Sequence, residues 1–112
     1  MTEQHNQPTE LVNTLTELVT ISEQMAECVA LQEFTVLDEK SLRRSEIIHT
    51  LQRIVRERTA PVTGEEKETV ELLHRSLNNA SRKLEKAMQD EKMKRLNILL
   101  NYKQQYKYLQ QF

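Results

Sequence analysis

Two residue pairs have a spacing that helical bundles use to hold metal ions. Glu46 stands three residues before His49, and Glu71 stands three residues before His74. On facing helices such Glu-x-x-His pairs supply the ligands of di-iron sites, provided that the side chains point inward. The apolar residues of the same segments instead put three of the four on outer faces and His74 on a flank. We therefore expect solvated surface residues and no metal site.

Groups for covalent catalysis are sparse. Cys28 is the only cysteine and has no histidine at helical spacing, and the single glycine, Gly64, cannot build a glycine-rich phosphate loop. No nucleophile stands out with a base and an orienting group, so we expect neither an enzyme nor a cofactor. A lone cysteine also cannot form an internal disulfide, which fits a reducing compartment.

Composition indicates a small all-α protein. The 112 residues include one glycine, two prolines and 29% charged residues, a composition typical of long helices and coiled coils. The length suffices for one modest core. The N-terminal residues contain neither a basic region nor an apolar core, and the longest aliphatic run is residues 98–100. We therefore expect no secretion signal, no membrane span and a cytoplasmic location.

Hydrophobic spacing predicts an antiparallel bundle of three to four helices. A first amphipathic helix is expected over residues 8–31, on an apolar stripe that Ser22 interrupts. Thr35 is the expected cap of a second helix, which the turn around Pro61 ends. Thr63 and Glu66 have the spacing of a capping box at the start of the third. The predicted organisation is a loose N-terminus at 1–7, a bundle at 8–92 and a C-terminal basic and aromatic helix at 93–112.

The third segment decides whether the bundle has three helices or four. Its apolar stripe weakens around residues 89–93 and restarts with a shifted phase at Leu96. A break there would give four helices of similar length, whereas a continuous helix would overhang the first two by half its own length. Because the segment contains no proline and no further glycine, we favour a continuous helix with a conditional bend at 89–93.

The net charge of -1 conceals a gradient along the chain. Lysine and arginine are absent up to residue 39, where the acids are Glu3, Glu10, Glu17, Glu23, Glu27, Glu33, Asp38 and Glu39. Acids are absent from residue 92 onward, where the bases are Lys92, Lys94, Arg95, Lys103 and Lys107. Such asymmetry favours docking of the two ends on each other or two separate partner surfaces, and solvated faces are the alternative.

The C-terminal segment is the candidate partner site, because most aromatic residues of the chain gather there beside basic ones. Rings bury large area at little entropic cost. The residues that we assign to partner binding are Leu96, Leu99, Leu100, Tyr102, Tyr106, Leu109, Lys94, Arg95 and Lys103. Permanent packing on the chain's own bundle and a helix that does both in turn are the alternatives. The arginines of the second helix alternate with glutamates and match no nucleic-acid motif, so we expect no direct nucleic-acid binding.

The segment from Gln32 to Ile48 resembles the FliT family of flagellar type III export chaperones. Phe34 stands where that family usually has tryptophan, Leu37 matches its leucine, and Arg43 or Arg44 matches its arginine. The family's usual glycine or acidic turn before Phe34 is absent here. Residues 94–102 are similar to the family's basic, tyrosine-bearing C-terminal helix, and the helix order agrees over about residues 11–106.

This resemblance implies a cytoplasmic chaperone that binds the filament-cap protein and delivers it to the export ATPase complex. Some members also restrain the flagellar master regulator by protein contact, and the family's C-terminal helix is associated with masking the partner groove. The corresponding hypothesis is that residues 11–88 present an apolar groove, which residues 96–109 occupy when no client is bound. The alternatives are a structural coiled-coil subunit, such as a homodimer through the long third helix, and a chaperone of another type III secretion substrate.

Overall fold

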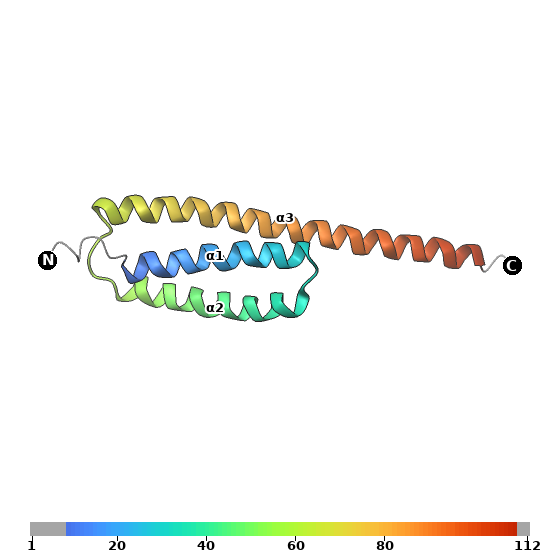
Figure 1. The fold of residues 1–112 in the computed structure, drawn as a ribbon, viewed down its shortest axis with the longest axis horizontal. Coiled ribbons are helices and arrows are strands. Elements are labelled where there is room, and N and C mark those ends of the chain that lie inside the picture. Colours follow the sequence, from blue (N-terminus) through green and yellow to red (C-terminus); the bar gives the residue numbers. More distant parts are fainter. Residues whose placement is uncertain (1–8, 110–112) are drawn as a thin grey trace.

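The structure is a bundle of three helices from which the third extends. The computed structural model describes residues 9–109, with side chains given for all of these except Ile98, Asn101, Tyr102, Gln105, Tyr106, Tyr108 and Leu109. Its helices are α1 (Glu10–Ala30), α2 (Phe34–Glu57) and α3 (Gly64–Leu109), and the described residues form no strand. The molecule is a rod with extents of 82 × 22 × 21 Å (Figure 1). The predicted all-α antiparallel bundle is confirmed.

Helix α1 lies between the other two (Figure 1). It packs on both α2 and α3, whereas within the described residues no Cα atom of α2 comes within 8 Å of one of α3. Helices α1 and α3 run in the same direction, and α2 runs antiparallel to both (Figure 1). Most buried side chains therefore belong to α1, because it alone is covered from two sides: Leu11, Thr14, Leu15, Leu18, Val19, Ile21, Ser22, Met25, Cys28 and Val29.

The core forms three clusters along the bundle. Their buried members are Leu11, Leu15 and Ile54 in the first, Leu18, Ile21 and Ile47 in the second, and Met25, Val29 and Leu84 in the third. Ser22, the polar interruption of the α1 stripe, is fully buried. Its hydroxyl donates to the Leu18 carbonyl at 2.7 Å and accepts from Nε of Arg44 at 3.1 Å, so both of its polar functions are used.

Both ends of α1 are capped. Thr9 is the N-cap, and its hydroxyl accepts from the Val12 amide at 3.2 Å. At the C-terminal end the Glu33 amide donates to the Cys28 carbonyl at 2.9 Å and the Gln32 amide to the Val29 carbonyl at 3.1 Å. This is a Schellman motif, formed with Gln32 rather than glycine in the left-handed conformation, at φ 59°.

Two predicted caps are wrong. Helix α2 begins at Phe34 with Glu33 as its N-cap, which makes no side-chain capping bond, so Thr35 lies inside the helix. At the start of α3 the Glu66 carboxylate does not reach back to Thr63. It is held instead by the guanidinium of Arg58, with Nη1 to Oε2 at 3.1 Å and a second bond through Nη2. The nearby arginine outcompetes the capping geometry, because a bidentate charged pair is stronger than a bond to one amide.

Helix α3 is continuous over its 46 residues. No break occurs at residues 89–93, so continuity is confirmed and the bundle has three helices rather than four. At 1.5 Å per residue the helix is roughly 70 Å long, about twice the length of α1. Its second part therefore runs beyond the turn that joins α1 to α2 (Figure 1).

Candidate protein-binding surface

The end of α3 beyond the bundle carries exposed apolar side chains. We call residues 92–109 the projecting segment; it follows the last α3 residues that pack on the core, Leu84 and Ala87. Within it the exposed fractions are 44% for Leu96, 48% for Leu99 and 48% for Leu100, and Met93 is similarly exposed. Helices in water normally cover such residues against another element. The projecting segment thus presents exposed apolar side chains, although its base contacts α2 through Arg95 and Phe34.

The structure places the predicted partner-binding residues on this segment. Lys94, Arg95 and Lys103 are exposed, as are the three leucines. Tyr102, Tyr106 and Leu109 belong to the same helix by their backbone, but their side chains lie outside the described residues. The masking hypothesis fails in this structure, because the unbroken helix carries Leu96, Leu99 and Leu100 away from the bundle instead of folding them onto it.

Among the described residues, the acidic side chains of α1 do not pair with the basic C-terminal part of α3. The acids of α1 that form ion pairs do so with α2: Glu10 Oε1 lies 3.3 Å from Arg53 Nη2, and Glu17 Oε2 lies 3.2 Å from Arg43 Nη2. These are surface pairs, which contribute little stability. Among the described residues, no ion pair joins α1 to the basic projecting segment, which extends beyond the end of α1 (Figure 1).

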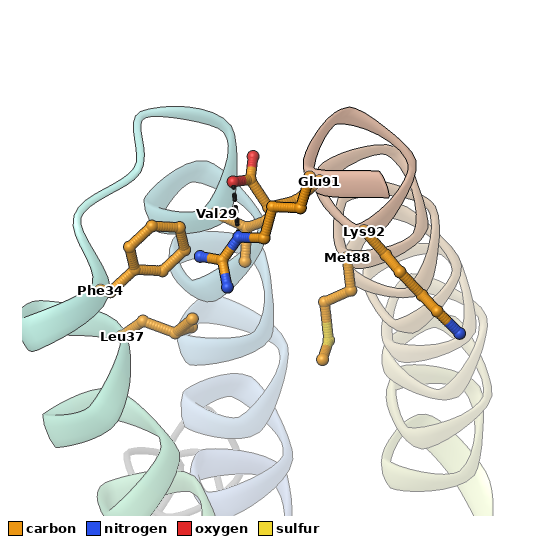
Figure 2. Close-up of a pocket in the computed structure, with 7 residues that line it drawn as sticks. Val29, Phe34, Leu37, Met88, Glu91 and Lys92 are labelled. Atoms are coloured by element: carbon orange, nitrogen blue, oxygen red, sulfur yellow. Dashed lines mark hydrogen bonds and ion pairs between the residues drawn. The ribbon is translucent and has the colours of Figure 1, made fainter. Parts of the chain in front are cut away.

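A pocket lies at the base of the projecting segment. We call it the root pocket; its volume is about 290 Å³, and it is lined by Val29, Phe34, Leu37, Met88, Glu91, Lys92 and Arg95. Figure 2 shows that α1, α2 and α3 each contribute to its walls, with Phe34 and Leu37 facing Met88 across Val29. The site is thus assembled only where three segments distant in sequence meet.

Arg95 spans the root pocket. Its guanidinium carbon lies 4.8 Å from the centroid of the Phe34 ring, within the range of a cation–π contact. Its Nε lies 3.3 Å from Oε1 of Glu91, one turn back on α3. The Arg95 side chain is nevertheless 64% exposed, whereas that of Glu91 is 14% exposed. The arginine therefore neutralises a mostly buried carboxylate and remains accessible from outside.

Sequence reasoning missed most of this pocket. It singled out Phe34 through the family resemblance, Leu37 through the resemblance and the apolar stripe, and Arg95 as a partner-binding residue, but it treated residues 89–92 as a weak point in the stripe. The overlooked signal was Met88 followed by Glu91 and Arg95 at helical spacing, which makes a turn with one apolar and one ion-paired side. Its pairing with Phe34 depends on tertiary structure, which no local pattern contains.

The two Glu-x-x-His pairs are on the surface, as expected. Glu46, His49, Glu71 and His74 are all exposed. Across the residues that the structure describes, no group of three or more histidine, cysteine, aspartate or glutamate side chains is placed to hold a metal ion. Cys28 is buried with a free thiol. Within the same range, no helix combines the length and apolar character needed to cross a membrane.

Comparisons of the chain with protein-family models, with curated proteins and with solved structures found no match.

Proposed function

We propose that this chain is a cytoplasmic chaperone of flagellar type III export, which binds the filament-cap protein and hands it to the export ATPase complex. A second activity, protein contact with the flagellar master regulator, is proposed with it, because some members of the FliT family act in that way. The observation that carries the proposal is the projecting segment, whose three leucines are 44–48% exposed and whose charged residues are all basic.

Exposed apolar residues gathered on one rigid element are typical of protein interaction sites. An amphipathic helix can bind a partner helix through side chains spaced three and four residues apart, as Leu96, Leu99 and Leu100 are. The segment is anchored at its base by the bundle, so the cost of ordering it is already met in the free chain. The proposed mechanism is that a client helix packs along the projecting segment and leaves again when the export apparatus competes for it.

Charge favours a different protein over a second copy of this chain. Two projecting segments packed side by side would bring lysines and arginines together with no acid from residue 92 onward to offset them. One observation supports the alternative of a coiled-coil homodimer, namely the length of α3 beyond the bundle. Sedimentation equilibrium separates the readings, because a homodimer predicts a mass that doubles with concentration in the absence of client.

The test is a calorimetric titration of the C-terminal segment of the filament-cap protein into the full chain. Leu96→Ser and Leu99→Ser should each weaken binding by about tenfold, since burying a leucine side chain contributes about 1.5 to 3 kcal/mol relative to leaving it exposed. Leu72→Ser is the matched control: Leu72 is 60% exposed on the same helix, but at the level of the bundle. It should change the affinity by less than about twofold.

A chain ending at Lys92 provides the second arm. All three core clusters lie before that residue, so the bundle keeps its buried contacts. Loss of binding would support the projecting segment as the contact surface. Tighter binding would instead support the masking hypothesis, in which this segment covers the client groove of the bundle. Absence of binding to the full chain would reject the filament-cap protein as the client.

A further inference from the structure

We propose that the root pocket receives one bulky aliphatic side chain from an acidic amphipathic helix of the client. The inference rests on the proposed function, because such a helix would approach along the projecting segment. It adds two properties that the proposed function leaves open: the residue by which the client is anchored, and the sign of the client's charge next to that residue.

The lining and size of the root pocket suit an aliphatic side chain. Val29, Phe34, Leu37 and Met88 present apolar groups from three helices (Figure 2). The volume of about 290 Å³ is at the lower limit of small-molecule sites, which span roughly 300 to 1,000 Å³. Met88 is 55% exposed at the rim, and methionine adapts its shape to an incoming group more readily than branched residues do.

The charges at the rim favour a carboxylate beside the anchor. Lys92 and Arg95 are exposed on the α3 wall, and Glu91 is the last acid of the chain. Among the described residues Glu91 pairs with Arg95, and Lys92 has no carboxylate within 4 Å. A client carboxylate one turn from the anchor would meet the accessible face of the Arg95 guanidinium, and Lys92 adds positive charge on the outer side of the same α3 turn (Figure 2). A lysine or arginine of the client at this position would be repelled by Lys92 and Arg95.

The position of the pocket favours a helical client over an isolated ligand. The root pocket opens where α3 passes the turn between α1 and α2, so the exposed leucines of the projecting segment begin just above it. A helix laid along that segment reaches the pocket with its end turn. Anchoring there and packing higher up are then parts of one interface, with the pocket fixing the register of the client.

The test uses fluorescence anisotropy with two labelled model helices. One is an amphipathic peptide of about 18 residues built from leucine and glutamate, and the other has every glutamate replaced by lysine. The full chain should bind the acidic peptide at least about tenfold more tightly than the basic one. Met88→Glu should weaken binding of the acidic peptide by about tenfold, because it places a carboxylate at the pocket rim.

Leu72→Glu is the matched control, since it introduces the same charge on α3 at a residue of similar exposure, away from the pocket. Lys92→Glu is a second pocket variant at an exposed position, so a folding defect of one variant would not decide the result. Equal effects of Met88→Glu and Leu72→Glu, or equal affinity for both peptides, would overturn the inference. Pocket-dependent binding of the acidic peptide without binding of the filament-cap segment would reject only the proposed client.

Discussion

The guanidinium carbon of Arg95 lies 4.8 Å from the centre of the Phe34 ring, so the base of the projecting segment is held against the first turn of α2. The contact links α2 and α3 directly through side chains, although each helix packs on α1 and no Cα atom of one comes within 8 Å of the other among the described residues. Arg95 also belongs to the residues assigned to partner binding from the sequence. The same side chain thus anchors the segment and lines the pocket.

A double-mutant cycle should detect this contact as a coupling between Arg95→Gln and Phe34→Leu. Both replacements keep the helices and most of the side-chain volume, but each removes one partner of the cation–π pair. We expect a coupling of about 0.5 to 1 kcal/mol in the free energy of unfolding, as for pairs near the surface. Urea denaturation followed by circular dichroism measures it. Additive effects of the two changes would show that the guanidinium does not rest on the ring in solution.

Ser22→Ala should destabilise the bundle although it removes a single oxygen. The Ser22 hydroxyl accepts from Nε of Arg44, which is half-buried, so the alanine leaves that donor without its acceptor. An unsatisfied buried group costs about 1 to 3 kcal/mol. Thr16→Ala is the control, because the exposed Thr16 hydroxyl donates only to the Val12 carbonyl of its own helix. If Arg44→Met did not reduce the cost of Ser22→Ala, the two residues would be energetically independent.

The pair of Glu66 and Arg58 should make stability depend on pH in the acid range. Both side chains are mostly buried. The hydrogen bond from Arg58, and after it that from Thr9, lower the pKa of Glu66 below its ordinary value of 4.5. A carboxyl group with a depressed pKa in the folded state stabilises the protein above the unfolded pKa, and this contribution is lost as pH falls through the folded pKa.

Glu66→Gln should therefore lower Tm at pH 7, and the difference from the native chain should shrink progressively below about pH 4.5. Differential scanning calorimetry across pH 2 to 7 measures this. Glu57→Gln serves as the control, because it breaks a solvent-exposed pair with Arg53 and should have a small effect. A Tm difference for Glu66→Gln that stayed constant with pH would show that the Glu66 charge does not contribute to stability.

More of the fold than of the candidate binding surface could be predicted from the sequence. The α1 stripe, including the interruption at Ser22, predicted which face is buried, because helical periodicity is local information. The absence of helix-breaking residues after Gly64 likewise predicted the continuous α3. Local patterns failed where side chains had several possible partners: Glu66 pairs with Arg58 rather than with an amide, and Glu10 and Glu17 of α1 pair with arginines of α2.

The site was predicted in part for the same reason. Leu96, Leu99 and Leu100 were identifiable because apolar residues continue in a helix longer than its neighbours. Whether these leucines pack on the bundle or extend beyond it depends on the path of α3 past the α1–α2 turn. The shifted hydrophobic phase near residues 89–93 did not allow this path to be predicted. The root pocket needs Phe34 and Arg95 side by side, and this proximity follows from packing on α1 rather than from either segment alone.

The turn between α1 and α2 offers a test of the same principle. Gln32 has φ 59° at the position where helices usually end in glycine. A side chain in the left-handed region is strained by contact between its Cβ and the backbone, whereas glycine is not. The hydrogen bonds from the Gln32 and Glu33 amides hold this conformation without glycine, so the sequence gives no composition signal for it.

Gln32→Gly should therefore stabilise the protein by about 0.5 to 1 kcal/mol, after allowing for the extra freedom of glycine in the unfolded chain. That corresponds to a rise in Tm of roughly 2 to 6 °C. Glu23→Gly, at an exposed position inside α1, should instead lower Tm, because glycine is unfavourable in a regular helix. If both replacements lowered Tm alike, residue 32 would be helical in solution. Helix α1 would then run on towards α2, and Phe34 could not take its place beside Arg95.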